Sequence, residues 1–146
     1  MTVALAASEV AAKIKQALPD SLIEAKEDSV LVNPATLVKV LDYLKRTPGL
    51  EFDYLTSITA VDYWDYFEVI YQLTSLTHNR SLVVKAHCQG REKLSLPSVV
   101  SVYQAADFQE REIFDLLGIR FEGHPNLKRI VLWEGFRGYP LRKDYL

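Results

Sequence analysis

Residues 67–74 read FEVIYQLT, and their apolar members alternate with polar ones. The side chains at positions 67, 69, 71 and 73 are apolar and those at 68, 72 and 74 are polar, which is the period of a strand with one buried face. Residues 52–62 are rich in β-branched and aromatic residues, and residues 82–86 alternate again after a turn at 77–80. The connections are too short for parallel crossovers, so the three runs predict an antiparallel meander.

Helical patterns precede this meander. Residues 8–18 and 34–47 carry apolar side chains at helical spacing, and each run ends at a proline. The second run begins after Asn33, a residue type that caps the N-termini of helices. Between the two helices, the short runs 22–26 and 29–33 have the character of a hairpin or of edge strands.

A third helix is predicted from about Ser98 or Val102 to Leu117, and Gly118 follows where a left-handed C-cap belongs. After Gly118, glycine and proline recur along the chain, and only residues 129–133 resemble a strand. The order of elements predicts an α+β fold in a single domain. A mixed or antiparallel sheet would pack against about three helices.

The predicted domain comprises residues 1–118, and residues 119–146 form an extended basic C-terminal tail. The tail holds six basic and three acidic residues, a net charge of +3, and because the whole chain carries −2, the first 118 residues carry −5. A basic tail beside an acidic body either folds onto that body, as part of the same domain, or lies on a partner.

The composition narrows the classes of function. Cys88 is the only cysteine, so the chain alone forms no internal disulfide and holds no iron–sulfur cluster, which needs several thiolates. A net charge of −2 gives no general attraction for nucleic acid. No apolar run approaches the roughly 20 residues of a membrane span, so direct membrane insertion is not expected.

Two glutamates of the third predicted helix lie among apolar neighbours. Glu110 falls on an apolar stripe with Leu117, and Glu112 lies between Phe108 and Leu116. A carboxylate in such a place must be paired, protonated or covered by a partner. Structural pairing is favoured over general acid–base catalysis, because nothing nearby supplies a nucleophile or an oxyanion site. The tail offers four candidate cations for the pairing: Lys128, Arg129, Arg142 and Lys143.

Arg111 lies four residues after Asp107, on a polar stripe of the same helix that also holds Asp115. An aspartate and an arginine at this spacing and in this order form a modest surface ion pair. We therefore expect Arg111 to pair with Asp107, and a contact with a partner is the alternative.

His124 precedes Pro125 in a loop flanked by glycine. It lacks companions as a metal ligand, because His78 lies in a predicted turn and the adjacent His87 and Cys88 point to opposite faces of a strand. A structural or hydrogen-bonding role is therefore expected for His124.

Two other classes of function remain open. A stand-alone enzyme would use Glu110 or Glu112 with His124 as an acid–base pair, and the purified chain would then be active with a bell-shaped pH profile. A nucleic-acid binder would use the basic tail, although the acidic body opposes such binding.

The C-terminal third resembles a known family. The run EREIFDLLGI at 110–119, followed by GHP at 123–125 and KRI at 128–130, is similar to the signature of the 30 kDa-type (C) subunits of the proton-pumping NADH:quinone oxidoreductase, respiratory complex I. The ending PLRKDY at 140–145 is similar to that family's closing motif. The resemblance is specific from about residue 95 onward and looser over 50–90.

The resemblance implies a non-catalytic structural and assembly subunit of the peripheral arm of complex I, in which electron transfer to quinone is coupled to proton translocation. No cofactor is expected on this chain, whereas NADH, FMN, quinone and iron–sulfur clusters would belong to partner subunits. The implied partners are other peripheral-arm subunits, chiefly the large one at the quinone site and the neighbouring ones that bear clusters. The implied location is peripheral, on the cytoplasmic side of the cell membrane.

An equivalent subunit of a related membrane-bound hydrogenase or ferredoxin-fed complex is the alternative within this resemblance. In either case the resemblance assigns interface or structural roles to the motif residues rather than catalytic or metal-binding ones. These residues are Glu110, Arg111, Glu112, Asp115, His124, Pro125, Arg129, Arg142, Lys143, Asp144 and Tyr145.

Overall fold

The computed structural model describes residues 3–4, 7–133 and 136–145. Its centre is the predicted antiparallel meander, formed by β4 (Tyr54–Asp62), β5 (Tyr66–Ser75) and β6 (Arg80–Gln89). The side chains at 67, 69, 71 and 73 of β5 are all buried, as their alternation predicts. The α+β fold in a single domain is confirmed.

Three further strands complete a mixed sheet. β3 (Ser29–Val32) and β1 (Val3–Ala4) both pair parallel with β6, and β2 (Leu22–Ala25) pairs antiparallel with β3. The strand order β2-β3-β6-β5-β4 leaves β4 at one edge. A separate two-stranded sheet joins β7 (Ser95–Pro97) to β8 (Arg120–Glu122).

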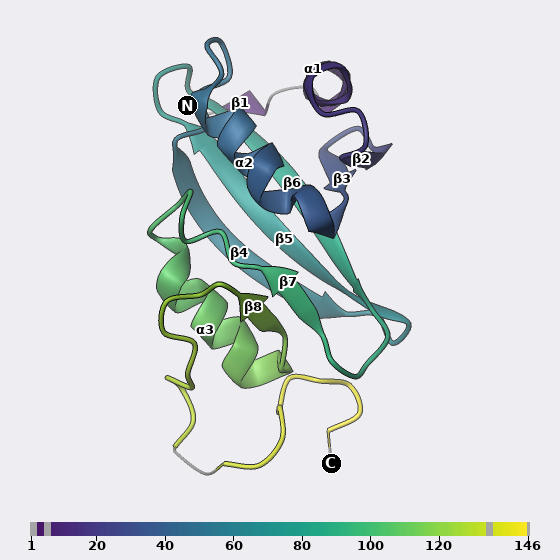
Figure 1. Ribbon diagram of the computed structural model, residues 1–146, viewed down its shortest axis with the longest axis vertical. Helices are drawn as coiled ribbons and strands as arrows, with labels where there is room; N and C mark the ends of the chain where they lie inside the picture. The colour runs from purple at the N-terminus through teal and green to yellow at the C-terminus, as the bar shows by residue number, and fades with distance from the viewer. Residues whose placement is uncertain (1–2, 5–6, 134–135, 146) are drawn as a thin grey trace.

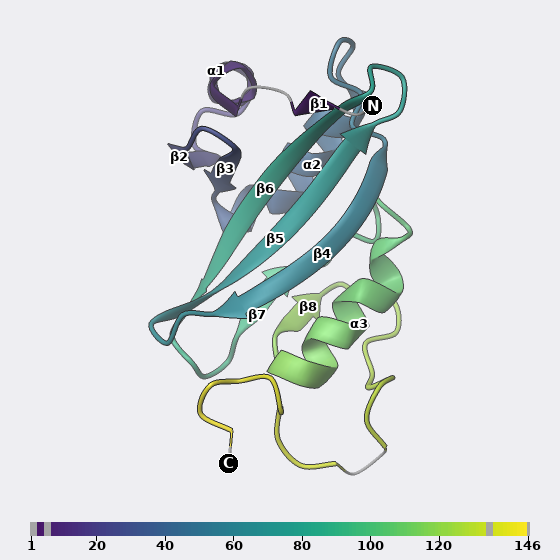
Figure 2. The same cartoon turned by 180° about the vertical axis from the view of Figure 1, so that it is seen from behind.

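Two helices cover one face of the sheet, whereas no helix of the described chain lies over the other face (Figures 1 and 2). These are α1 (Ala7–Ala17) and α2 (Leu37–Arg46). The apolar positions 37, 40, 41 and 44 of α2 are fully buried, because residues three and four apart share one side of a helix. A short 3-10 turn precedes α2, and the Asn33 side chain caps that turn by accepting the Ala35 N–H at 3.0 Å.

The third helix, α3 (Ala106–Leu117), packs beside edge strand β4. It begins later than the predicted Ser98 or Val102, because residues 98 and 99 bond instead to a side chain of α3 and residues 99–103 form a separate turn. Gly118 has the predicted left-handed conformation at the C-cap, with φ of 78°. None of the described helices combines the length and the apolar character that a bilayer crossing requires.

The tail runs back past the end of α3 to the lower end of the sheet (Figure 1). Residues 129–133 do not form the predicted strand, because the backbone N–H groups of residues 130–132 bond to a side chain rather than to a neighbouring strand. Residues 134–135 and 146 of the predicted tail lie outside the described residues.

Candidate functional site

Glu110 is fully buried, and its carboxylate bonds to the segment before α3. The Ser98 hydroxyl donates to one carboxylate oxygen at 2.6 Å and the Val99 N–H donates to the other at 2.8 Å. Burial raises the pKa of Glu110, and these two hydrogen bonds oppose the rise only in part. The expected cation from the tail does not bind this carboxylate, so that expectation is wrong.

Asp115, further along the same helix, is the carboxylate that the tail binds. It is fully buried, and one of its oxygens accepts three successive backbone N–H groups, from Ile130 at 3.1 Å, Val131 at 2.7 Å and Leu132 at 2.9 Å. The Arg129 guanidinium forms an ion pair with the other oxygen. Burial by itself would raise the pKa of Asp115, but these donors outweigh it and hold the pKa below its usual range.

Arg129 ties the rest of the tail to the same place. Its guanidinium donates to three carbonyl oxygens, those of Asp115 at 2.7 Å, Phe136 at 2.6 Å and Gly138 at 2.6 Å. The guanidinium also lies over the rings of Phe136 and Tyr139. We call Asp115, Arg129 and the backbone of 130–132 the helix–tail joint. Every donor in it binds a group of this chain, so the joint is structural.

A second joint fastens the end of the tail to the turn between β4 and β5. Arg91 makes two hydrogen bonds of 2.7 Å to the buried carboxylate of Asp62 and one of 3.0 Å to Asp144. The Lys143 N–H adds a bond of 2.9 Å to Asp62. The bonds from Arg91 dominate and, against the opposing effect of burial, hold the pKa of Asp62 well below its usual range. We call Asp62, Arg91 and Asp144 the hairpin–tail joint.

Sequence reasoning missed Asp62 and Arg91, because they lie 29 positions apart and neither falls in a periodic pattern with the other. For Asp115, by contrast, the position in the helix already indicated that donors from elsewhere in the chain would bind the carboxylate. A carboxylate in the last turn of a helix faces the negative end of the helix dipole, so it requires donors from outside the helix.

Arg142 and Gly118 bring the tail against the end of α3. Arg142 donates to the Leu117 carbonyl at 2.5 Å, and its guanidinium lies over the rings of Phe67 and Tyr139. A Cβ at Gly118 would lie 2.6 Å from Arg142 and 2.7 Å from the Tyr139 ring. Glycine is therefore required at position 118 for two reasons: there is no room for a Cβ, and φ is positive.

Arg111 does not form the expected surface ion pair with Asp107, which contacts His124 instead. Arg111 is buried, lies over the Phe108 ring and donates to the Lys128 carbonyl at 3.4 Å. Asp107 faces His124 instead, whose Nε2 lies 3.0 Å from the Asp107 carbonyl oxygen and 3.1 Å from its carboxylate. The Nδ1 of His124 accepts the Asn126 N–H at 2.9 Å. Nε2 thus holds the loop to α3 and Nδ1 holds the turn within the loop, which agrees with a hydrogen-bonding role.

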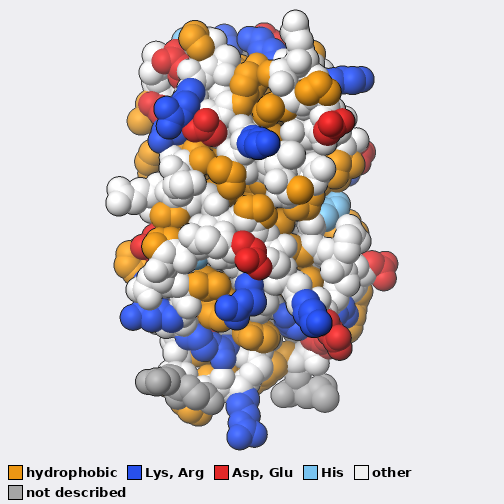
Figure 3. Space-filling model, viewed as in Figure 1, with side chains coloured by type: hydrophobic (Ala, Val, Ile, Leu, Met, Phe, Trp, Pro, Cys, Tyr) orange, Lys and Arg blue, Asp and Glu red, His pale blue; other side chains and the backbone are white. Residues whose placement is uncertain are grey.

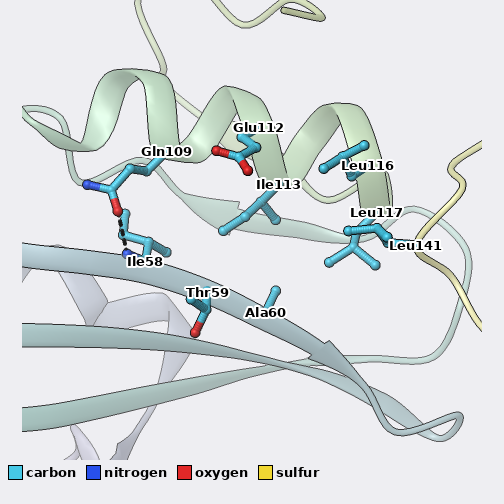
Figure 4. Close-up of a pocket in the computed structure, with 9 residues that line it drawn as sticks. All are labelled: Ile58, Thr59, Ala60, Gln109, Glu112, Ile113, Leu116, Leu117 and Leu141. Carbon is cyan, nitrogen blue, oxygen red and sulfur yellow. Dashed lines mark hydrogen bonds between the residues drawn. The ribbon is translucent and has the colours of Figure 1, made fainter. Parts of the chain in front are cut away.

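Glu112 is exposed, so the expectation that its carboxylate must be paired, protonated or covered is wrong, although apolar side chains do lie near it. Its apolar neighbour Phe108 is itself 64% exposed, so the side of α3 that carries both residues faces solvent. Glu112 lines a groove of about 210 Å³ between α3 and β4 (Figure 4). There the Gln109 side chain accepts the Ile58 N–H at 2.6 Å and so occupies one donor of the sheet edge.

The remaining motif residues lie on the surface of the tail. Pro125 and the Lys143 side chain are exposed, and Tyr145 is 41% exposed while stacking on Phe136. Four other apolar side chains near the tail are exposed as well: Ile130, Val131, Trp133 and Leu141. The tail therefore presents apolar groups outward, while Arg129, Arg142 and part of its backbone bind inward.

Cys88 on β6 is expected to be unreactive in the folded chain. It is 4% exposed, and burial raises the pKa of its thiol to about 11, so little thiolate forms at neutral pH. Alkylation with iodoacetamide at pH 8 should be at least about tenfold slower in buffer than in urea, where the thiol has its ordinary pKa. Equal rates would show that the β6 region opens readily.

The chain is similar to proteins of one family. The model of the family described as respiratory-chain NADH dehydrogenase, 30 Kd subunit, matches residues 30–146. A relative from Rhizobium meliloti, the second C-type subunit of its NADH-quinone oxidoreductase, is 44% identical over 117 residues, which are 78% of this chain and 63% of that protein. The C-type subunit of the same enzyme from Dinoroseobacter shibae is 38% identical in an alignment of 151 positions, gaps included, that covers 99% of this chain and 69% of that protein.

A mitochondrial protein and a solved structure extend the similarity. The mitochondrial NADH-ubiquinone oxidoreductase 30.4 kDa subunit of Neurospora crassa is 39% identical over 122 residues, 82% of this chain and 42% of that protein. The chain thus spans less than two thirds of the length of the Rhizobium and Neurospora relatives. A chain in the structure of the membrane-bound sulfane sulfur reductase, an archaeal respiratory membrane complex, has a TM-score of 0.75 and 24% identity, with 94% of this chain and 84% of that chain covered. This likeness shows the shared fold.

Proposed function

Since this chain belongs to the family of the 30 kDa subunit of respiratory-chain NADH dehydrogenase, we propose that it is a non-catalytic, cofactor-free structural subunit of the peripheral arm of an NADH:quinone oxidoreductase. Electron transfer from NADH to quinone and proton translocation would be performed by partner subunits that hold FMN, iron–sulfur clusters and the quinone site. The chain would attach peripherally, on the cytoplasmic side of the cell membrane, through those partners.

One observation carries the non-catalytic part of the proposal: the titratable groups of the signature are engaged within the chain. Glu110 accepts from Ser98 and Val99, and both nitrogens of His124 bind the backbone around them. Glu112 lies on an exposed side of α3. An acid–base pair requires a carboxylate and an imidazole that face a common substrate position, whereas Glu110 and His124 are occupied by groups of this chain.

The tail supports a role in assembly. Trp133 is 68% exposed, Leu141 60% and Val131 56%, although the backbone beside them is fastened to α3 and β4. Exposed aromatic and aliphatic side chains on a fixed backbone are typical of protein interfaces. We assign the large quinone-site subunit and the neighbouring cluster-bearing subunits as the partners that cover them.

Recovery of partners from the membrane tests this function. A tagged full-length chain, expressed in its native cell, should recover cluster-bearing and quinone-site subunits from detergent-solubilised membranes. The co-purified electron-input subunits would also separate an NADH-fed complex from a hydrogenase or a ferredoxin-fed complex. Recovery of the chain alone, from cells whose complex is otherwise intact, would contradict the proposal.

Deletion of residues 138–146 is expected to impair assembly while leaving the domain folded. The deletion removes Leu141 and Tyr145, together with Arg142 and Asp144, but leaves Asp115 and Arg129 in place. Because loss of a few interface anchors costs more than about 1.4 kcal/mol, the amount of complex on a native gel should fall about tenfold or more.

Two point variants of similar exposure sharpen that test. Trp133→Ser removes an exposed side chain of the tail, whereas Leu76→Ser removes one that is 66% exposed next to β5. Only the tail variant should reduce assembly, and circular dichroism should show both proteins folded. Equal recovery of both variants would count against the tail as an interface.

A further inference from the structure

A hollow of about 340 Å³ lies where the loop after β6, the end of α3 and the tail meet. Four of its lining side chains are basic and one is acidic. On the face shown in Figure 3, Lys and Arg side chains gather over the lower third, where Figure 1 places the end of α3 and the tail. We call this site the basic hollow, and its lining residues are Arg91, Glu92, Lys93, Leu94, Gly118, Arg120, Tyr139 and Arg142.

Three of the four cations form no salt bridge with a carboxylate among the described residues. Arg91 is neutralised by the two aspartates of the hairpin–tail joint. Arg142, by contrast, donates only to backbone carbonyls, and Arg120 contacts the Phe114 ring. Lys93 forms no ion pair with the described part of the chain. Glu92 is the one acidic side chain in the lining, so the basic hollow has an excess of positive charge.

Two of these cations, Arg142 and Arg120, are also held in position. Arg142 is fixed by its bond of 2.5 Å to the Leu117 carbonyl and by the rings of Phe67 and Tyr139. Arg120 belongs to β8, whose backbone is bonded to Leu94 at 2.9 Å. A fixed cation loses less side-chain entropy on binding than a mobile one, which favours recognition of an anion.

The surroundings of the basic hollow have the composition of a protein interface. Trp64 is 51% exposed and packs on Arg91, and Tyr63 beside it is 45% exposed. Tryptophan, tyrosine and arginine are the residues most enriched at the energetic centres of protein interfaces. A polyanion such as nucleic acid would be repelled by the net charge of −5 on residues 1–118. A few carboxylates of a folded partner would contact only the hollow, so a protein is the favoured occupant.

We propose that the basic hollow receives acidic side chains of a partner protein of the complex, which bind Lys93, Arg120 and Arg142 while Trp64 packs at the rim. This inference rests on the proposed function, because it requires that the chain is assembled with other subunits. Beyond the proposed function, it names a binding site on the side of the chain formed by the 90–94 loop and β8. It also states that the partner surface at this site is acidic.

Zero-length cross-linking of the intact complex tests the contact directly. A carbodiimide adds to a carboxyl group and activates it. An amine in contact with that carboxyl group then forms an amide with it, and the carbodiimide leaves as a urea. In purified complex, Lys93 should be joined to an aspartate or glutamate of another subunit, identified by mass spectrometry. The variant Lys93→Arg keeps the positive charge but lacks the amine, so assembly should persist while this adduct disappears. Coupling of Lys93 only within its own chain would overturn the proposal.

Charge reversal supplies an independent measurement. The double variant Lys93→Glu, Arg120→Glu should reduce the partners recovered with the tagged chain by about tenfold or more, because it places like charges in contact. Lys26→Glu, an exposed lysine after β2, is the control and should leave recovery unchanged. If the unaltered chain recovers its partners and the double variant recovers them equally well, the basic hollow is not an interface and the proposed function stands.

A small anion is the competing occupant. Inorganic phosphate added to the free chain should bind weakly or not at all by calorimetry, since the proposal places protein carboxylates in the site. Phosphate binding that is abolished by Arg120→Glu, together with no adduct at Lys93, would assign the basic hollow to a free phosphate instead.

Discussion

Replacing Asp115 with alanine is expected to lower the free energy of unfolding by about 3–5 kcal/mol, the cost of removing one partner of a buried ion pair. The substitution leaves the Arg129 guanidinium and three N–H groups of residues 130–132 without their acceptor. These donors belong to consecutive residues, so the loss of their acceptor should release residues 129–133 from α3 as a unit. Urea denaturation of the purified chain measures the loss, and proteolysis should cut the tail first.

Asp115→Asn is the matched control for charge, because it keeps the size and one oxygen acceptor. The folded pKa of Asp115 is lowered, so its ionisation stabilises the fold fully above its ordinary pKa of 3.8, and this contribution is lost as the pH falls through the folded pKa. The gap in stability between the natural chain and Asp115→Asn should therefore be full at neutral pH and narrow below about pH 4. A gap independent of pH would show that the charge contributes nothing.

Replacing Glu110 with alanine is expected to cost about 3 kcal/mol, because the Ser98 hydroxyl and the Val99 N–H would remain buried without an acceptor and a cavity would form. The bonds hold the segment before α3 against the helix, so the variant should also loosen residues 98–105. Thermal unfolding measures the first effect, and hydrogen exchange of the Val99 amide measures the second.

Glu110→Gln separates the hydrogen bonds from the charge. The folded pKa of Glu110 is raised above its ordinary value of 4.5, so the natural chain loses stability as the pH rises from that value through the folded pKa. Glutamine cannot ionise, so the stability of the Glu110→Gln variant relative to the natural chain should increase as the pH rises above about 4.5. The opposite trend would mean that Glu110 is held as a carboxylate in the folded chain.

Glu110 and Asp115 are both fully buried on the same helix, yet their pKa values shift in opposite directions. Glu110 has two neutral donors, whereas Asp115 has three N–H groups and a guanidinium. Five positions of sequence separate them, and no local pattern distinguishes their surroundings. The difference arises entirely from which segment of the chain lies over each turn of α3.

The failed expectations share this origin. Arg111 was expected to pair with Asp107 at helical spacing, but the Lys128 carbonyl and the Phe108 ring compete for its guanidinium. The predicted helix start and the predicted strand at 129–133 also failed, because a buried carboxylate of α3 binds the backbone of each segment. A carboxylate buried by tertiary packing needs donors, and that need overrides local propensity.

The sequence by itself determined the central meander, the burial of alternate residues on β5, the caps at Asn33 and Gly118, and the family. These features depend on the period of apolar residues, on the chemistry of single positions or on an ordered motif, all of which are local. Only the tertiary structure decided which carboxylates are buried, which cations bind them and where a basic hollow remains. Such pairings join residues as distant as Asp62 and Lys143. They exist because the free energy of a charge depends on the groups that folding brings around it.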